Sequence, residues 1–350
     1  MISLAGLSCK DIEGLFLPLP SFRAKQVYKW IVKGVFDFEK MTDIPLDLQK
    51  ELNQRFSIFS SKIDSVYDDI DTKKIAIALN DGAKIEAVLL SDGKDRYTAC
   101  LSTQAGCPAG CVFCKTGTLG FLRNLTCSEI SEQFLHLKSF LSSASSTNSA
   151  PLREIHNIVI MGMGEPLLNL EQLRKAVSFF TDPKGMNFSR KRITVSTCGI
   201  CDGLFDLAKN GPYIRLALSL TTADEQLRQR LMPITKNNPL SKVKEALILF
   251  QKKSGDRITL EIPLLGGINT REWDALSIAE FAKGLQCVVN IIPWNPVPGL
   301  EFEGKPLIEP GKNEVNNFIK LLEQNKLKVT VRYKKGRGVN GACGQLGVIN

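Results

Sequence analysis

The spacing of apolar positions divides the chain into regions of different structure. Up to residue 57 they follow helical periodicity, with one amphipathic stretch ending at Gly34 and a second beginning after Pro45. Residues 75–79 and 84–90 then read as strands separated by turn residues. We therefore expect a helical module over 1–57, followed by a strand-rich extension over 58–96.

From residue 97 onward, short apolar runs alternate with helical stretches. Counting the run that ends at Leu101, six strands are expected, the other five at 156–161, 193–196, 214–220, 258–264 and 287–292. Strands joined by crossover helices form parallel sheets. Six units are too few for a closed eight-stranded barrel, so the pattern predicts an α/β fold with a partial (βα)6 barrel over 97–325. Ligands of such sheets bind at the carboxyl ends of the strands.

Composition narrows the class of protein and its compartment. The chain has 350 residues, of which 43% are hydrophobic and 23% charged, as in soluble globular proteins. No secretory signal and no apolar run of about 20 residues is visible, so we expect no membrane segment. The ten cysteines then indicate a reducing cytoplasm, with thiols available for ligation or catalysis.

Positive charge is concentrated in two places, although the net charge is only +9. Residues 324–350 contain six basic side chains and no acidic one: Lys326, Lys328, Arg332, Lys334, Lys335 and Arg337. The second cluster is Arg190-Lys191-Arg192. Such segments suit a phosphate backbone. The alternative reading of the final segment, 326–350, is a solvated basic tail.

The run Cys107-x3-Cys111-x2-Cys114 places three thiols within eight residues of a glycine-containing loop. Thiolates select iron–sulfur clusters or zinc. Three ligands on a cubane cluster leave one iron open for the amine and carboxylate of S-adenosylmethionine. A zinc site would need a fourth ligand, and neither His136 nor His156 lies at metal-ligand spacing. Radical chemistry on S-adenosylmethionine is the favoured interpretation, ahead of zinc and of unrelated structural cysteines.

Small polar residues and glycines follow several of the predicted strands and should meet at one rim. They are Gly164, Glu165, Ser196, Ser219, Thr221 and Asn295, joined there by the cysteine loop. Glu165 offers a carboxylate to a ligand ammonium, and the hydroxyl and amide groups suit a carboxylate, a ribose or an adenine edge. Each motif alone is weak, because an ordinary turn or helix cap has the same composition. Their common position makes the rim a candidate binding site.

Three other residues stand apart from this rim. Glu86 lies within a predicted strand, where a carboxylate usually points to water. Cys100 belongs to the first barrel strand, seven residues before the cluster loop. Cys343 lies in a glycine-rich tail that we expect to be too flexible for a core element. The pair Cys198 and Cys201 is interpreted as two structural thiols.

Taken together, the motifs resemble those of the RlmN family of dual-specificity RNA methyltransferases, which are radical S-adenosylmethionine enzymes. The similar stretches span nearly the whole chain: Phe22-Arg-Ala-Lys-Gln with Trp30, the three-cysteine run, Met161-Gly-Met-Gly-Glu-Pro-Leu-Leu-Asn169, Arg192-Ile-Thr-Val-Ser-Thr197, Ile292-Pro-Trp-Asn-Pro296 and Ala342-Cys-Gly-Gln-Leu346. One departure is Thr221, where the family usually has histidine.

The resemblance implies a role for each candidate residue. Cys107, Cys111 and Cys114 would hold a 4Fe–4S cluster. S-adenosylmethionine, two molecules per turnover, would bind to Gly164, Glu165, Ser196, Ser219, Leu220, Thr221 and Asn295. Cys343 would carry the methyl group, Cys100 would resolve the intermediate through a transient disulfide, and Glu86 would be the proton acceptor.

The implied reaction is methylation of adenine C2 in 23S rRNA at the peptidyl transferase centre and in some tRNAs next to the anticodon. The implied protein is a cytoplasmic monomer that recognises RNA through its helical module and basic segments. A flavodoxin- or ferredoxin-type protein would supply electrons. Three alternatives remain: an adenine-C8 methyltransferase of the related resistance family, a glycyl-radical activase, and a non-catalytic, zinc-dependent RNA-binding protein.

Overall fold

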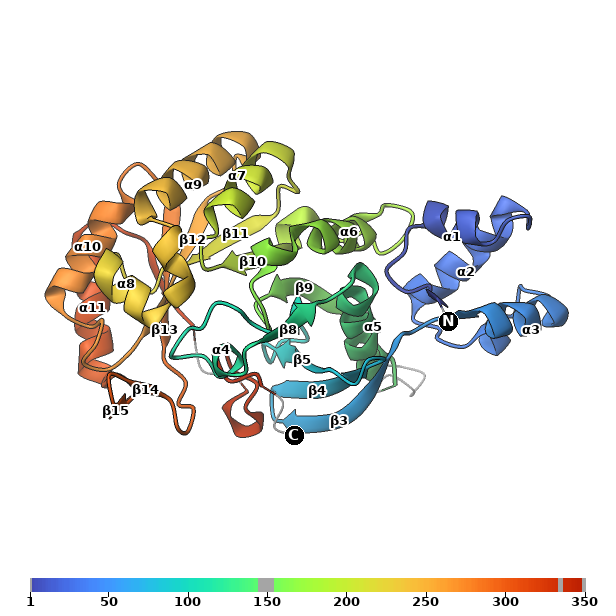
Figure 1. The fold of residues 1–350 in the computed structure, drawn as a ribbon, viewed down its shortest axis with the longest axis horizontal. Coiled ribbons are helices and arrows are strands. Elements are labelled where there is room, and N and C mark those ends of the chain that lie inside the picture. Colours follow the sequence, from blue (N-terminus) through green and yellow to red (C-terminus); the bar gives the residue numbers. More distant parts are fainter. Residues whose placement is uncertain (1, 144–153, 333–335, 348–350) are drawn as a thin grey trace.

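The computed structural model describes residues 2–143, 154–332 and 336–347, which are built around one ten-stranded sheet (Figure 1). The strand order is β16-β13-β12-β11-β10-β9-β6-β5-β4-β3. The bounds are β3 Ser61–Asp69, β4 Thr72–Leu79, β5 Lys84–Ser91, β6 Tyr97–Leu101, β9 Ile155–Ile160, β10 Ile193–Thr197, β11 Arg215–Ser219, β12 Ile258–Leu264, β13 Cys287–Pro293 and β16 Val329–Val331. The three short pairs are β1 Ile2–Ser3 with β2 Phe56–Ser57, β7 Gln104–Gly106 with β8 Phe121–Asn124, and β14 Glu301–Phe302 with β15 Lys305–Pro306.

Seven strands of this sheet are parallel and form an open, curved barrel wall: β6, β9, β10, β11, β12, β13 and β16. The six strands expected from the apolar runs are all present in this wall, in chain order. A seventh parallel strand, β16, pairs with β13 through the match of Asn290 with Thr330. Its residues lie in the final segment, 326–350, for which the sequence predicts no strand, because a run of three strand residues gives too short a pattern.

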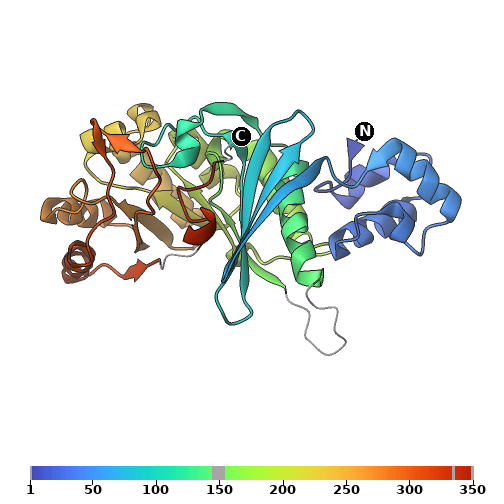
Figure 2. The ribbon, with the colours of Figure 1, turned by 90° about the horizontal axis from the view of Figure 1, so that it is seen from below.

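The remaining strands continue the same sheet in antiparallel order, β6-β5-β4-β3. The joint between the two parts is the pair β5–β6, in which Val88 lies opposite Cys100. Seen from below, β3, β4 and β5 curve away beside the barrel opening (Figure 2). The strand-rich extension is thus continuous with the barrel and forms one side of its mouth.

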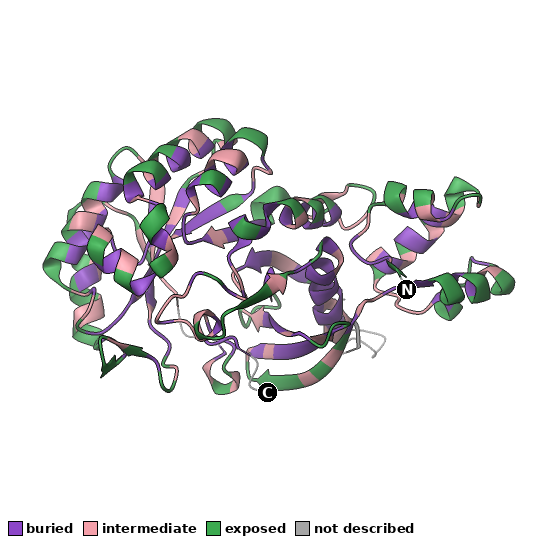
Figure 3. Ribbon diagram, in the orientation of Figure 1, coloured by how far each residue is buried: buried purple, intermediate pink, exposed green. Residues whose placement is uncertain are grey.

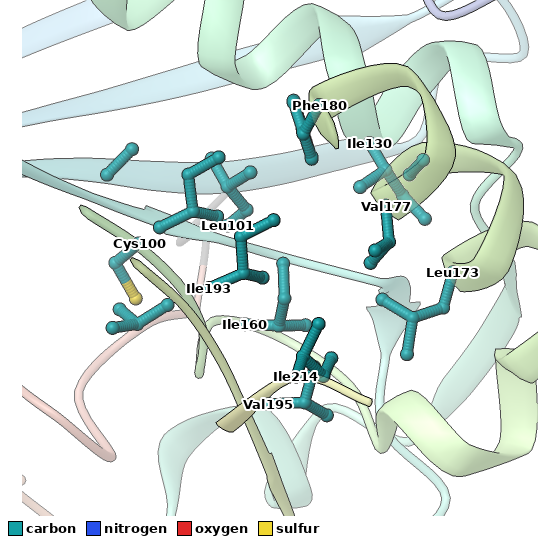
Figure 4. Packing of buried hydrophobic residues seen from close by; sticks show 14 of the residues in the cluster. Cys100, Leu101, Ile130, Ile160, Leu173, Val177, Phe180, Ile193, Val195 and Ile214 are labelled. Carbon is teal, nitrogen blue, oxygen red and sulfur yellow. The ribbon is translucent and has the colours of Figure 1, made fainter. Parts of the chain in front are cut away.

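Helices cover the outer, convex face of the sheet, and buried residues lie where helices and sheet face each other (Figure 3). Most of these buried residues are apolar. They are α5 Cys127–Ser143, α6 Leu170–Thr181, α7 Cys201–Asn210, α9 Leu240–Ser254, α10 Glu272–Ala282 and α11 Lys312–Gln324, with α4 Lys115–Thr118 and α8 Glu225–Leu231 near the barrel mouth. Figure 4 shows Leu101, Ile160 and Val195 of the strands packed against Ile130 of α5 and Val177 of α6. This apolar layer holds the helices against the sheet.

Two of the helix starts show how local sequence sets these bounds. Thr126 followed three residues later by Glu129 predicts a capping box at the start of α5, and the structure confirms it: the Thr126 hydroxyl accepts from Glu129 N, and the Glu129 carboxylate accepts from Thr126 N. The sequence predicts Asn169 as the cap of α6, and it does stand at the start of that helix, but its side chain does not cap it. Its amide instead donates to the carbonyls of Thr103 and Leu125, and so ties the cysteine-bearing segment to the barrel.

The N-terminal helices form a lobe beside α5 and α6, with α1 Cys9–Leu15, α2 Ser21–Lys33 and α3 Leu46–Arg55. The prediction that Gly34 ends a helix is confirmed by its left-handed conformation after α2. A buried carboxylate joins this lobe to the barrel, since Glu132 of α5 accepts hydrogen bonds from Ser3, Ser60 and Ser61. The lobe therefore has a fixed attachment to the barrel.

The expectation that the glycine-rich tail is too flexible for a core element is wrong. Ala342 and Leu346 are buried, and Leu346 belongs to the main apolar core. The serine-rich composition of 142–150 predicts an insertion, and this segment falls outside the described residues from 144 onward. None of the helices in the described ranges is both long and apolar enough to cross a bilayer.

Candidate functional site

The cysteine loop connects β7 to α4 and is held at its start and in its second half. Cys107 N donates to Gly120 O at 2.7 Å, and Val112 N donates to Leu231 O at 3.0 Å. Gly106 has φ +74°, and a Cβ there would lie 2.0 Å from the Gly120 carbonyl oxygen. Only glycine fits that position. The loop therefore has a defined shape, with its middle resting on the end of α8.

The three thiols Cys107, Cys111 and Cys114 line one cavity of about 170 Å³ at the barrel mouth. Burial is the main cause that raises the pKa of each thiol, that of Cys107 to about 12. The three thiols lie near one another, so three thiolates here would repel each other and would need a cation to offset their charge. Soft, buried sulfur ligands with an open cavity beside them fit an iron–sulfur cluster.

The spacing of these thiols differs from that of a single-ion site. In the described part of the chain, no three His, Cys, Asp or Glu side chains converge closely enough to hold one metal ion. A tetrahedral zinc site requires such convergence. A 4Fe–4S cluster would instead bind each thiolate to a different iron.

Five of the predicted rim residues line the same cavity: Gly164, Glu165, Ser196, Ser219 and Asn295. The Glu165 carboxylate accepts from the Thr197 hydroxyl at 2.6 Å and from Cys198 N at 2.8 Å, as well as from Leu167 N at 3.0 Å. These donors fix its orientation, and a carboxylate has room for a further donor. The prediction that strand ends converge on one rim is confirmed for these residues.

Gly164 is required by a close approach of two segments. Its φ is +107°, and an added Cβ would lie 2.6 Å from the Gln104 side chain. The Gln104 amide oxygen in turn accepts from Glu165 N at 2.8 Å. The glycine therefore lets the segment after β9 lie directly against β7, which brings Glu165 to the thiols.

Leu220 and Thr221 are placed differently from the other rim residues. Both are buried, and neither is among the residues that line the cavity. Thr221 has φ +65°, a rare conformation for a β-branched residue, and its hydroxyl has no hydrogen-bond partner among the described residues. The structure thus brings the backbone of this segment close to the site, while a contact of Leu220 or Thr221 with a cofactor stays a prediction.

Glu261 also belongs to the rim, and we did not single it out from the sequence. It lies on β12 in register with Ser219, lines the cavity and accepts from the Ser196 hydroxyl at 2.6 Å. The Ser196 and Ser219 hydroxyls are 3.0 Å apart. A carboxylate within the apolar run of 258–264 was the available signal, but a strand carboxylate alone does not show which face it occupies.

Cys343 lies between this cavity and a second one of about 350 Å³. Cys100 lines the second cavity together with Cys343, Met161 and Asn295. Burial, and next the neighbouring Cys343, raise the pKa of Cys100 to about 12. The two thiols that the family resemblance pairs therefore share one cavity, and both are free in this structure.

The tail that carries Cys343 is fixed by hydrogen bonds to the site. The Asn295 amide donates to Cys343 O at 3.1 Å, and Lys115 N donates to Gly344 O at 2.8 Å. The Thr116 hydroxyl donates to Leu346 O at 2.5 Å. Lys115 and Thr116 open the helix directly after Cys114. These contacts explain why a glycine-rich segment is ordered here, and they fasten the tail to the cysteine loop.

Arg332 has a different environment from the one its sequence context suggested. We grouped it with the basic residues of the C-terminal segment that suit a phosphate backbone, yet its guanidinium points into the site. Nη1 lies 3.2 Å from Cys343 Sγ and 3.8 Å from Glu261 Oε1. Cys343 first, and Glu261 next, raise the pKa of Arg332, while burial acts in the other direction. Arg332 thus joins the tail cysteine to the rim.

Glu86 lies on the face of the sheet that carries Cys100, but it is not among the residues that line either cavity. Its carboxylate is buried and already has two partners. Oε1 accepts from Lys74 Nζ at 2.8 Å, and Oε2 accepts from Gly347 N at 2.7 Å. The expectation that a strand carboxylate points to water is therefore wrong for Glu86.

Comparison with known proteins identifies the family to which this geometry belongs. Residues 101–278 match the Radical SAM superfamily, and residues 2–58 match the ribosomal RNA large subunit methyltransferase N-terminal domain. A probable dual-specificity RNA methyltransferase RlmN of Treponema denticola is 48% identical over 99% of this chain and 95% of that protein. The chain belongs to the RlmN family.

Two further similarities agree with this assignment. The dual-specificity RNA methyltransferase RlmN of Lawsonia intracellularis is 38% identical over 99% of this chain and 96% of that protein. The crystal structure of a radical SAM methyltransferase from Sphaerobacter thermophilus has a TM-score of 0.92 at 33% identity, covering 99% of both chains. The protein is therefore an S-adenosylmethionine-dependent methyltransferase with the radical SAM fold, as the sequence predicted.

Proposed function

We propose that this RlmN family member methylates C2 of specific adenosines in 23S rRNA and in some tRNAs, with Cys343 as the carrier of the methyl group. The observation that carries the proposal is the position of Cys343. This thiol lines both the cavity of the cysteine trio and the cavity that contains Cys100. A carrier has to meet a methyl donor on one side and an acceptor on the other.

Cys107, Cys111 and Cys114 would hold a 4Fe–4S cluster in this proposal, and Glu165, Ser196, Ser219 and Asn295 would bind S-adenosylmethionine. When bound, the cluster supplies the electron that turns S-adenosylmethionine into a source of carbon radicals. The protein contributes orientation and exclusion of water: its rim side chains are fixed by hydrogen bonds such as those from Thr197 and Cys198 N to Glu165.

The first stage of the proposed reaction is displacement at sulfur. The Cys343 thiolate attacks the methyl group of S-adenosylmethionine, and S-adenosylhomocysteine leaves. Arg332 Nη1, 3.2 Å from Cys343 Sγ, supports the sulfur from the side of β16, and the Asn295 amide holds the Cys343 carbonyl. Two independent contacts therefore fix the nucleophile relative to the rim.

The second stage moves the carbon to adenine. C2 lies between two ring nitrogens and is electron-poor, so it accepts a carbon radical more readily than it attacks a methyl cation equivalent. One hydrogen atom of the S-methyl group would pass to the deoxyadenosyl radical, which leaves as 5′-deoxyadenosine, and the carbon would then add to C2 and link the base to Cys343. A base removes the C2 proton, and the Cys100 thiolate attacks the Cys343 sulfur, so that an S–S bond forms as the C–S bond breaks and the released carbon takes up a proton to become the methyl group. The one electron that is left over would return to the oxidised cluster. The transient disulfide requires Cα atoms about 4.4–6.8 Å apart.

Glu86 is the proposed proton acceptor, and its contacts set a condition for that role. In the observed conformation Gly347 N donates a hydrogen bond to one of its oxygens, and Lys74 Nζ donates to the other. For Glu86 to accept a proton from adenine, the contact with Gly347 has to open. We therefore propose that the end of the tail moves when RNA enters, while Lys74 stays as the partner of the carboxylate.

RNA binding is proposed for the N-terminal lobe and the exposed basic cluster at Arg190–Arg192. On α2, the Phe22 ring is 49% exposed and Arg23 lies over it, which offers a stacking surface to an unpaired base. An adenine has to leave its stack to reach Cys343. We propose a flavodoxin- or ferredoxin-type protein as the electron donor and a monomer as the active form.

The test is analysis of nucleosides from RNA treated anaerobically with the reconstituted protein. The expected product is 2-methyladenosine, formed by the wild type and by Cys287→Ala, but not by Cys343→Ala. An 8-methyladenosine product would instead identify the C8 enzyme. Undiminished activation of a protein substrate by Cys343→Ala would identify a glycyl-radical activase. A colourless, iron-free protein after anaerobic purification would contradict the cluster and favour the zinc alternative.

A further inference from the structure

Arg228 is a buried cation close to the cysteine loop that none of the roles above uses. It lies on α8, is fully buried, and is the largest of the fully buried side chains in the described part of the protein. Nε donates to Leu220 O at 3.0 Å, and Nη2 donates to Cys198 O at 2.6 Å and to Ser219 O at 3.4 Å. The guanidinium therefore links the ends of β10 and β11, from which the rim residues project.

The charge of Arg228 is not neutralised by these contacts. All three acceptors are backbone carbonyls, and Nη1 has no hydrogen-bond partner among the described residues. Burial lowers its pKa, against the effect of Cys198 and Glu225, but a guanidinium remains protonated in proteins. An unpaired buried charge is costly. Glu225, one turn earlier on α8, offsets part of this charge, and one buried oxygen of its carboxylate has no hydrogen-bond partner among the described residues.

The cysteine loop, where a bound cluster would add further negative charge, also lies close to Arg228. Val112, between Cys111 and Cys114, donates its N–H to Leu231 O on the last turn of α8, three residues after Arg228. Cys198, whose carbonyl Arg228 holds, lines the same cavity as the three ligand cysteines. Met232, directly after α8, lines it too. The guanidinium is thus attached to the wall of the cavity on the side where the loop packs.

We propose that Arg228 is a positioning residue that acts on the cluster as a fixed positive charge and raises its reduction potential. The inference rests on the proposed function, because it requires the cluster. A 4Fe–4S cluster on three thiolates is an anion and gains another negative charge on reduction. A fixed cation within the low-dielectric wall stabilises the reduced form more than the oxidised form. The hydrogen bonds to Cys198, Ser219 and Leu220 keep that cation in place.

The experiment is a redox titration of the cluster in the full chain, monitored by electron paramagnetic resonance without RNA. Arg228→Met removes the charge, and Arg228→Lys keeps it. We expect the Met variant to lower the ratio of reduced to oxidised cluster about tenfold at a given potential, a shift of about 59 mV for one electron. The Lys variant should remain within about threefold of the wild type. Arg174→Met is the control, since Arg174 also binds backbone carbonyls but lies on α6, away from the cavity.

The outcomes distinguish the effect of the charge of Arg228 from the effect of its hydrogen bonds, which brace the ends of β10 and β11. An unchanged potential in Arg228→Met, with iron and sulfide content like the wild type, overturns the proposal. Equal shifts in the Met and Lys variants also overturn it, because bracing alone would then be responsible. If the Met variant does not fold, Arg228→Gln makes the same comparison while keeping an amide donor for the Cys198 carbonyl. A wild type that binds no cluster refutes the proposed function itself, a result distinct from any change among variants.

Discussion

The backbone N–H of Gly347 donates a 2.7 Å hydrogen bond to Oε2 of Glu86, a residue 261 positions earlier in the chain. The contact joins the tail of the proposed methyl carrier to the proposed proton acceptor. Because Lys74 holds the other carboxylate oxygen at 2.8 Å, the buried acid has a partner on each side. Movement of the tail and availability of the base are therefore coupled through one hydrogen bond.

The first prediction concerns the stability of the Lys74–Glu86 pair. Lys74→Met leaves a buried carboxylate without its cation and should lower the free energy of unfolding by about 3–5 kcal/mol. Glu86→Gln should also destabilise, and the double variant should lose less than the sum of the two. Urea denaturation gives all three values. Lys73→Met, whose partner Asp68 is exposed, should cost about 1 kcal/mol or less. If the double variant lost the full sum of the two single losses, Lys74 and Glu86 would not be energetically coupled.

The second prediction concerns the reactivity of Cys100. With a pKa of about 12, this thiol is protonated at neutral pH, and the reactive thiolate fraction rises tenfold per pH unit below that value. We expect labelling of Cys100 by iodoacetamide, followed by mass spectrometry of its peptide, to increase steadily between pH 8 and about 10. A labelling rate that levels off near pH 8 would show that its environment is not the one described.

The third prediction concerns acid stability at the joint between the lobe and the barrel. Burial lowers the pKa of His136 to about 4, from about 6.5 in an unfolded chain. Between these values the unfolded chain binds more protons, so the stability contributed by neutral His136 is complete above pH 6.5 and declines toward pH 4. The loss amounts to about 3 kcal/mol over that window.

His136→Gln isolates this effect. Glu132, which shares the Ser61 hydroxyl with His136, has a pKa raised by burial and contributes a slope of opposite sign. The difference in unfolding free energy between wild type and variant therefore should shrink as the pH falls from 7 to 5. A constant difference across that range would contradict a buried neutral histidine.

The fourth prediction separates ligand cysteines from the other thiol of the cavity. Cys198 lines the same cavity as the trio, although we interpreted it from sequence as a structural thiol. After anaerobic reconstitution, Cys111→Ala should lose the iron and sulfide of the wild type, whereas Cys198→Ala should retain them. Retention in Cys111→Ala, or loss in Cys198→Ala alone, would contradict the ligand assignment.

The barrel and the rim could be predicted from the sequence because their signals are local. The six barrel strands are apolar runs, and the rim residues follow them directly, so Glu165, Ser196 and Ser219 meet once the strands are parallel. The three cysteines could be predicted to meet because they lie within eight residues of one loop. Parallel topology converts position along the chain into position in space.

Contacts between distant segments could not be predicted in this way. Arg332 and Glu86 each have an unremarkable sequence context, a basic tail and a strand carboxylate. Their partners, Cys343 and Gly347, are determined by the path of the tail across the barrel mouth. Neither hydrophobic periodicity nor motif spacing along the chain predicts that path. Arg228 is similar: a basic residue on a short helix usually faces solvent, and only the packing of α8 against the strand ends buries it.

The most direct test of the central claim is the mass of the Cys343 peptide. The reconstituted protein is incubated with S-adenosylmethionine without RNA under anaerobic conditions, digested and analysed by mass spectrometry. The account predicts one added methyl group on Cys343, which disappears when RNA and an electron donor are supplied and 2-methyladenosine forms. Methylated RNA formed by a protein whose Cys343 never carries the group would contradict it.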